Sequence, residues 1–168
     1  MNRTKRDVNI SSEHGTLEEL WLRDLWQSQW GGDVMISRGH AYLLHDLKWL
    51  FARLDGELAG AATYRPDGRN GIELMSLDAT RKGLGIGTSL LRYLENNAAG
   101  NSIQRLWLIT SNDNVDSLRF YQKRGYRFQS IYPGAIDEAR KKKPSIPLFG
   151  DYGIEIHDEI ELAKDLTS

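Results

Sequence analysis

Two apolar runs, at residues 48–54 and 57–64, are separated by only two residues, Asp55 and Gly56. This dipeptide suits a type I′ turn, because both central residues of that turn need a positive φ. The sequence therefore predicts a β-hairpin over these two runs. The strands of a hairpin are antiparallel, so this one feature excludes a purely parallel, doubly wound sheet.

Helical patterns precede and follow the hairpin. Thr16 and Glu19 match a capping box, which predicts a helix that begins there and ends near Gln29. Its apolar stripe would consist of Leu17, Leu20, Trp21 and Leu25. The residues before this helix are polar, and we expect residues 1–10 to be frayed. Later helices are predicted around Leu90, Leu91, Leu94 and Ala98, over residues 115–123 with Gly125 as a left-handed cap, and over residues 135–142.

Predicted strands alternate with these helices, at residues 72–77, 103–110 and 126–131. The last predicted strand covers residues 154–162, in which isoleucine and leucine alternate with Glu155, His157, Glu159 and Glu161. Its acidic face would suit a cationic amine, and an exposed sheet face explains the same pattern. We expect one domain over residues 1–168, of the α+β or mixed α/β class, in which a mixed sheet has helices on both faces.

The composition excludes several kinds of site and partner. The chain has no cysteine, which excludes disulfides, zinc–thiolate sites and a cysteine nucleophile. Its formal net charge of −1 gives no general attraction to nucleic acid or to an anionic membrane. No apolar run approaches the roughly 18 residues of a membrane span, and no apolar segment follows the basic N-terminus as in a secretory signal. We therefore expect a cytoplasmic protein that uses no metal.

A glycine-rich turn at residues 82–88 lies between a predicted strand and a predicted helix. Glycines let the backbone approach an anion, and the following helix N-terminus presents free amides, so this turn is typical of a phosphate site. A tight connection without any ligand is the alternative. No lysine follows Gly87 as in a Walker A loop, and the glycine spacing differs from that of a dinucleotide-binding fingerprint.

A second motif follows one strand later, where Asn114 is a good N-cap for the helix that contains Tyr121. The residues that fill every place of the pattern N-x-x-A/S-x-x-(apolar)-Y-x-K-x-G-(F/Y) are Asn114, Ser117, Phe120, Tyr121, Lys123, Gly125 and Tyr126. Together with the turn, in which Lys82 stands where arginine or glutamine is usual, this motif shows that the chain resembles the GNAT superfamily of acyl-CoA-dependent N-acetyltransferases. The resemblance implies a central mixed, mostly antiparallel sheet flanked by helices on both faces.

The resemblance also implies a cofactor, acetyl-CoA, and the residues that hold it. The turn would bind the pyrophosphate, and Lys82 keeps the positive charge of arginine without its bidentate fork. The strand that ends at Leu77 would pair with the pantetheine arm, close to Asn114. The residues expected to bind the cofactor are Leu77, Asp78, Lys82, Gly83, Leu84, Gly85, Ile86, Gly87, Thr88, Asn114 and Tyr121.

The implied reaction is direct attack of an amine on the thioester in a ternary complex, since an acyl-cysteine cannot form without cysteine. By the same resemblance Tyr121 is the general acid for the departing thiolate, and the backbone amide of Leu77 or Asp78 stabilises the oxyanion. Glu73, expected on the same strand face as Leu77, is the first candidate for the general base. A cross-strand ion pair explains this glutamate equally well. Asp78 is the next candidate base.

The expected acceptor is a small-molecule amine or an amine of a peptide or protein, and not a nucleic acid or a membrane. Trp26, Trp30, His40 and His45 could line its pocket, whereas the basic run at residues 140–143 fits a solvated helix end. Homodimers are frequent in folds of this kind, and the sequence identifies no interface. Two other hypotheses stay open: an acyl-CoA-binding regulatory module without turnover, and a nucleotide-dependent enzyme of another class, which rests on the glycine turn alone.

Overall fold

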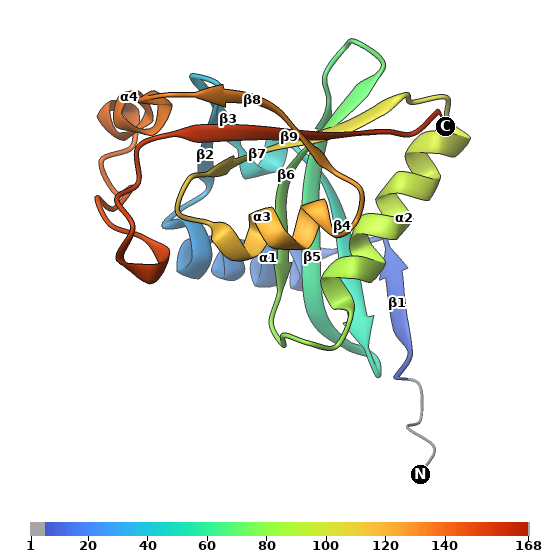
Figure 1. The fold of residues 1–168 in the computed structure, drawn as a ribbon. Coiled ribbons are helices and arrows are strands. Elements are labelled where there is room, and N and C mark those ends of the chain that lie inside the picture. Colours follow the sequence, from blue (N-terminus) through green and yellow to red (C-terminus); the bar gives the residue numbers. More distant parts are fainter. Residues whose placement is uncertain (1–5, 168) are drawn as a thin grey trace.

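The computed structural model describes residues 6–167, and in this range its main feature is a seven-stranded sheet (Figure 1). The strand order is β1-β4-β5-β6-β7-β9-β8, and neighbours are antiparallel except β6 and β7, which are parallel. The strands are β1 (Val8–Ser11), β4 (Lys48–Leu54), β5 (Glu57–Pro66), β6 (Gly71–Ala79), β7 (Arg105–Ser111), β8 (Arg127–Tyr132) and β9 (Glu159–Asp165). The mixed, mostly antiparallel sheet is confirmed.

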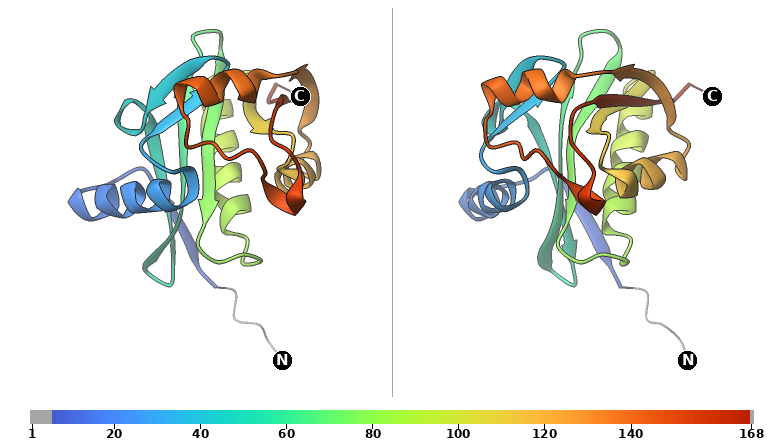
Figure 2. Two further views of the ribbon diagram at one scale, coloured as in Figure 1. Left: turned by 90° about the vertical axis from the view of Figure 1, so that its left-hand side faces the viewer. Right: turned by 60° about the vertical axis from the view of Figure 1, so that its left-hand side comes forward.

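Helices cover both faces of this sheet (Figure 1, Figure 2). They are α1 (Thr16–Trp30), α2 (Ile86–Gly100), α3 (Val115–Gln122) and α4 (Ala135–Lys142), with short 3₁₀ turns at Leu44–Asp46 and Asp151–Gly153. α2 and α3 pack on one face, where Leu90, Leu91, Leu94 and Ala98 are buried as predicted. On the opposite face lie α1 and a hairpin of β2 (Val34–Ser37) and β3 (His40–Leu43), which the sequence analysis does not predict. Across residues 6–167, no helix is long and apolar enough to cross a membrane.

Two predicted turns are confirmed. The dipeptide between β4 and β5 has φ values of 51° and 85°, so this hairpin closes through the expected kind of turn. After α3, Gly125 has a φ of 90° and donates its N–H to the Gln122 carbonyl, while the Tyr126 N–H donates to the Tyr121 carbonyl. These two bonds form a Schellman motif, which returns the chain from α3 to β8.

The start of the chain differs from the prediction. β1 pairs along its whole length with β4, so the expectation of a frayed segment is wrong for residues 8–10, while residues 1–5 lie outside the described part. β1 is short and is stabilised by pairing with a strand far along the chain. This pairing cannot be predicted from the residues of β1 alone. The predicted capping box does not form either: Gly15 is the N-cap and has no side chain, so only the other half of the motif is present, in which the Gly15 N–H donates to Glu18 Oε2 at 2.8 Å.

The buried face of α1 is only partly the predicted one. Leu17 and Leu20 are exposed, whereas Leu22 and Trp26 are completely buried. These two residues are one turn apart and pack, with Trp49, in the apolar cluster between α1 and the sheet. Leu17 and Leu20 are five and two residues before Leu22, so at about 3.6 residues per turn they lie on the far side of the helix and remain in solvent.

A β-bulge in β6 reverses the predicted alternation of side chains along this strand. The register between β5 and β6 shifts by one residue at Met75, which is left without a register partner. Leu77 consequently packs in the core shared with α2 and α3, while Glu73 lies on the opposite face, against β2. The prediction that Glu73 and Leu77 share a face is wrong, because one extra residue moves every later side chain to the other face.

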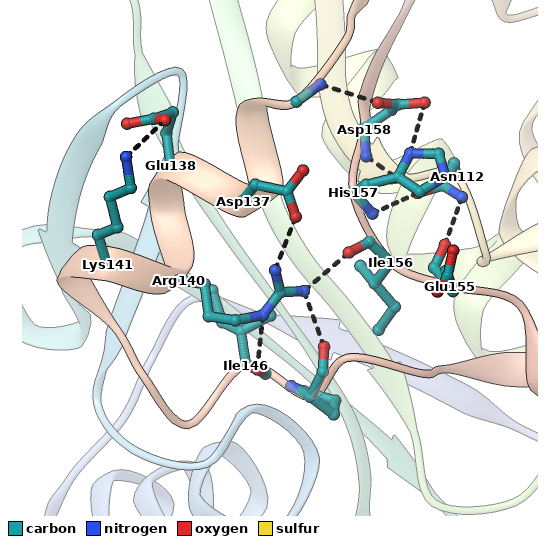
Figure 3. A network of polar contacts seen from close by, with 12 residues as sticks. Asn112, Asp137, Glu138, Arg140, Lys141, Ile146, Glu155, Ile156, His157 and Asp158 are labelled. Atoms are coloured by element: carbon teal, nitrogen blue, oxygen red, sulfur yellow. Dashed lines mark hydrogen bonds and ion pairs between the residues drawn. The ribbon is translucent and has the colours of Figure 1, made fainter.

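The last strand begins later than predicted. β9 starts at Glu159, which pairs with Ser111, the final residue of β7. The residues before Glu159 lie beyond the end of β7 and cannot pair with it. A side chain holds them in place instead. The Asn112 Oδ1 accepts hydrogen bonds from the N–H groups of His157 and Asp158, both at 3.0 Å (Figure 3).

Gly60 of β5 lies where α2 begins and should not tolerate a side chain. A Cβ at this position would come within 2.6 Å of Ile86 Cγ2 and 2.8 Å of the Asp78 carbonyl oxygen. We expect Gly60→Ala to lower the free energy of unfolding by about 1–3 kcal/mol. Gly100→Ala is the matched control, since a Cβ there meets no atom within 4 Å, and it should leave stability unchanged or raise it by about 0.4–1 kcal/mol. Urea unfolding compares them, and a Gly60→Ala protein as stable as wild type would contradict the prediction.

Candidate active site

The turn between β6 and α2 contains glycines in the left-handed conformation. Gly83 and Gly85 have φ values of 77° and 76°, and a Cβ at either position would meet no atom within 4 Å. Their backbone conformation, and not a lack of space, therefore accounts for glycine at both positions. Gly85 is also the N-cap of α2, so the unpaired N–H groups of the first helical turn lie beside it. This arrangement favours binding of an anion.

A pocket of about 510 Å³ opens at this turn, bounded by the end of β6 and by α3. The predicted cofactor-binding residues that line it are Leu77, Lys82, Gly83, Gly85, Ile86, Gly87, Thr88 and Tyr121. The lining residues that the sequence analysis does not assign are Ala79, Arg81, Asp116, Ser117, Phe120 and Arg124. The two sequence motifs therefore meet in the wall of one pocket.

Three of the predicted cofactor-binding residues have their side chains engaged elsewhere. Leu84 packs against the core between the sheet and α2. Asn114 caps α3 by accepting from the Ser117 N–H at 3.3 Å, and its Nδ2 donates to the end of β7. Asp78 directs its carboxylate towards α1, where Trp30 donates to it. Any contact of these residues with a ligand in the pocket would use their main chain.

Arg124 lines the pocket with a positive charge, although its sequence position does not assign it to the site. Its Nε and Nη2 donate to Thr88 Oγ1 at 3.2 and 2.6 Å, and its Nη1 donates to the Phe120 carbonyl at 2.8 Å. The guanidinium carbon also lies 3.6 Å from the centroid of the Phe120 ring. A guanidinium has five N–H donors, so two remain for a ligand at the start of α2.

β6 and β7 separate beside this pocket. They pair through only four residues of each strand, ending at Leu74 and Leu108, although both strands continue. Within residues 6–167, the register of β6 with β7 goes no further, so the later part of this edge is free. The Thr80 N–H donates to the Ala59 carbonyl of β5, and N–H directions alternate along a strand, so the Leu77 N–H points towards the free edge. An extended ligand can pair there.

Tyr121 lies in the pocket wall and is 7% exposed. Its ring packs edge-on against the rings of Phe120 and Tyr126. Burial, and after it the negative charge of Asp78, raise the pKa of the Tyr121 hydroxyl above its usual value, while Arg124 acts in the opposite direction. The hydroxyl therefore keeps its proton at neutral pH and can serve as a proton donor.

Two carboxylates of β6, Asp78 and Glu73, are candidate bases on the face that carries α1. Asp78 is half-buried, accepts from Trp30 Nε1 at 3.2 Å, and has its pKa raised by burial to about 6. Glu73 pairs with Arg65 at 2.5 Å, across the strands, and accepts from Ser37 Oγ at 2.5 Å. Burial raises the pKa of Glu73 as well, against the lowering effects of Ser37 and Arg65. Glu73 thus forms a cross-strand ion pair, which is one of the two equally good explanations that the sequence leaves for this residue.

The sequence makes four residues candidates for the lining of an acceptor pocket. Trp26 is completely buried and donates to Ser76 Oγ at 3.3 Å. His40 and His45 are exposed on the surface. Trp30, at the end of α1, is the one whose hydrogen bond reaches a candidate base.

The basic run at residues 140–143 is only in part the solvated helix end that its sequence predicts. Lys141 fits this prediction, because its side chain is 71% exposed and pairs with Glu138 of the same helix. Lys142 Nζ donates to the Gly39 carbonyl, and Lys143 Nζ donates to the carbonyls of Trp30 and of β2. Arg140 donates to three main-chain carbonyls of the segment between α4 and β9 (Figure 3). These three residues therefore join α4 to α1, to the β2–β3 hairpin and to the segment before β9.

Comparison with known proteins gives consistent matches. The model of the acetyltransferase (GNAT) family matches residues 16–126, which include the glycine turn and α3. The uncharacterized protein YdhI of Bacillus subtilis is 40% identical over 144 residues, covering 85% of this chain and 89% of YdhI. An IAA acetyltransferase from Bacillus cereus has a TM-score of 0.69 at 24% identity, over 95% of this chain and 99% of the other. A GNAT family acetyltransferase from Elizabethkingia anophelis, solved with acetyl-CoA bound, has a TM-score of 0.69 at 19% identity, over 97% and 99%. These two structures share the fold.

Asp78 should make the folded chain less stable as the pH rises. Its pKa is raised from 3.8 to about 6, so the folded state binds this proton more tightly than the unfolded state. The resulting stability is present below about pH 4 and is lost as the pH rises through about 6. We expect Asp78→Asn to be more stable than wild type at neutral pH by about 1–3 kcal/mol, and this difference to vanish in acid. Urea unfolding over this pH range measures it, and a difference that does not change with pH would contradict the assignment.

Proposed function

The chain belongs to the GNAT acetyltransferase family, and we propose that it transfers an acetyl group from acetyl-CoA to a primary amine. The observation that carries this proposal is the pocket at the start of α2, which opens beside the free edge of β6 and has Tyr121 in its wall. A protein of the same fold has been solved with acetyl-CoA bound, which supports the choice of donor.

The charges of the pocket suit a ligand with phosphate groups. Arg81, Lys82 and Arg124 contribute cations, against one carboxylate, that of Asp116, among its lining residues. The N–H groups at the start of α2 add the positive end of the helix dipole. We assign the diphosphate of acetyl-CoA to the turn at residues 82–88. Arg124 supplies the planar, bidentate donor geometry that Lys82 lacks.

The free edge of β6 suits the pantetheine arm, because its amide groups can pair with an open strand. When bound, acetyl-CoA supplies an activated acetyl thioester. The Leu77 N–H points towards this edge and is our candidate donor to the carbonyl oxygen on which negative charge develops. From the sequence, Leu77 and Asp78 are equal candidates for this role, and the alternation of N–H directions favours Leu77.

Asp78 and Tyr121 divide the proton transfers in this proposal. With a pKa of about 6, the Asp78 carboxylate is ionised at neutral pH and accepts the proton that the amine must lose. The Tyr121 hydroxyl keeps its proton and donates it to the departing sulfur. Because Glu73 is occupied by Arg65 and Ser37, we favour Asp78 over Glu73 as the base. The chain has no cysteine, so the amine attacks directly with both substrates bound.

Calorimetric titration tests the donor. We expect wild type to bind acetyl-CoA at least about tenfold more tightly than NAD or ATP, and Arg124→Gln to weaken acetyl-CoA binding by about tenfold, as for loss of a hydrogen bond to a charged group. Arg127→Gln is the matched control, because Arg127 is an exposed arginine of β8 outside the pocket, and it should bind like wild type. Tighter binding of NAD or ATP would overturn the proposal in favour of a nucleotide-dependent enzyme.

Release of the CoA thiol, followed over a panel of primary amines, tests turnover without background from protein thiols. We expect Tyr121→Phe to lower kcat by about 10²- to 10⁴-fold, because it removes the general acid, while acetyl-CoA still binds. The control is Tyr126→Phe, which removes a buried hydroxyl that has no hydrogen-bond partner in the described part of the chain; its kcat should equal that of wild type. Equal kcat in both variants would contradict the role of Tyr121. Binding of acetyl-CoA without turnover of any amine would favour the regulatory module.

A further inference from the structure

Three glutamates form a buried cluster on the sheet face that carries α1 and the β2–β3 hairpin. Glu73 of β6, and Glu159 and Glu161 of β9, are 1%, 1% and 8% exposed. The hairpin covers them, since Ser37 donates to Glu73 and the Arg38 N–H donates to Glu159 at 3.2 Å. Of the two explanations that the sequence leaves open for β9, the exposed sheet face is therefore excluded.

The three carboxylates are not equally compensated. Glu73 and Glu161 each form an ion pair with an arginine of the sheet, at 2.5 and 2.7 Å. Glu159 accepts one main-chain hydrogen bond through Oε2, while its Oε1 is buried and has no partner within residues 6–167. A buried carboxylate oxygen without a partner costs free energy when the group is charged, and a further positive charge beside it would lower this cost.

Arg38 shows that a positive charge is accommodated beside these glutamates. Its guanidinium carbon lies 3.4 Å from the centroid of the Tyr132 ring, and its Nη1 lies 3.9 Å from Glu161 Oε1. The Arg38 side chain is 42% exposed and belongs to the turn between β2 and β3. Because the ion pair is long and the arginine is partly exposed, a cation that replaces the guanidinium would mainly have to take over its contact with the Tyr132 ring.

The glutamate cluster and the proposed base, Asp78, lie on the same face of the sheet. Glu73 and Asp78 are on the same strand, and their partners place both side chains on the face of α1 and the hairpin. Glu159 pairs with Ser111, at the end of the strand that diverges from β6. Burial raises the pKa of Glu159, Arg38 acts in the opposite direction, and the charge of Glu73 adds a smaller upward effect. An acceptor whose amine lies at Asp78 could therefore extend over the same sheet face towards this cluster.

We propose that the acceptor carries a second positively charged group, which Glu159, Glu161 and Tyr132 hold while the reacting amine lies at Asp78. This inference rests on the proposed function and narrows its substrate class. A carboxylate on the acceptor would be repelled by the same glutamates, and a neutral group would leave Glu159 Oε1 without a partner.

Two matched pairs of acceptors isolate the second charge. Putrescine differs from pentylamine in having an ammonium in place of a terminal methyl group, and alanyl-arginine amide differs from alanyl-citrulline amide in having a guanidinium in place of a urea. We expect kcat/KM to be higher by about tenfold or more for the charged member of at least one pair. The pair that shows this difference indicates whether the acceptor is a small diamine or a peptide. Equal kcat/KM within both pairs overturns this inference and leaves the proposed function in place. No thiol release with any acceptor overturns the proposed function itself.

Variants locate the preference in the cluster. Glu159→Gln should reduce the preference for the charged acceptor by about tenfold. Glu155→Gln is the matched control, because this exposed glutamate belongs to the same acidic alternation but not to the cluster, and it should not change the preference. A preference that survives Glu159→Gln, or that Glu155→Gln lowers equally, overturns the assignment. Arg38→Gln alters an exposed side chain that competes for the same place and should raise the preference; a lower preference in this variant also overturns it.

Discussion

β6 and β7 pair through four residues and then diverge, and the candidate site depends on this divergence. If the strands stayed paired, their ladder would use the Leu77 N–H, which instead points to an open edge. The bulge at Met75 adds a second condition, because it directs Leu77 towards α3 and Asp78 towards α1. One strand thereby presents a main-chain donor to its edge, an apolar side chain to the pocket and a carboxylate to the opposite face.

Packing on both faces of the sheet holds the end of β6 in this conformation. On one face, α2 can begin against β5 only because Gly60 has no side chain. On the other, Ser76, the residue after the bulge, accepts from the Trp26 indole at 3.3 Å and shares a hydrogen bond of 2.6 Å with Thr63. A buried hydroxyl with two partners costs little, whereas the same hydroxyl in an unbulged strand would lose them. The bulge is therefore fixed by polar contacts from α1 and β5.

Features governed by neighbouring residues could be predicted from the sequence, and features governed by distant contacts could not. The turn at Gly125 and the glycines before α2 need positive φ values, which their residue types announce. The turn between β2 and β3 has the same requirement, because Arg38 and Gly39 have φ values of 51° and 78°. Arginine is not typical of such a turn, so this hairpin could not be predicted. The bulge at Met75 arises from the register of two strands and leaves no mark in the pattern. Within the site, Arg124 occupies a motif position at which any residue is accepted, so only the fold reveals its place in the pocket.

The face opposite α2 is assembled by side chains that join distant segments to Asp78. Lys143 Nζ donates to the Trp30 carbonyl at 2.6 Å and to the Val34 carbonyl at 2.7 Å, and the Trp30 indole donates to Asp78. A displacement of α4 or of the β2–β3 hairpin would therefore act on the proposed base, Asp78, through Trp30. The proposed donor pocket relies instead on main-chain groups of one turn and on α3. Binding of the two substrates thus depends on different kinds of contact. The donor pocket depends on local conformation, which a short motif can encode. The acceptor side depends on long-range side-chain contacts, which can change with the acceptor while the motif stays the same.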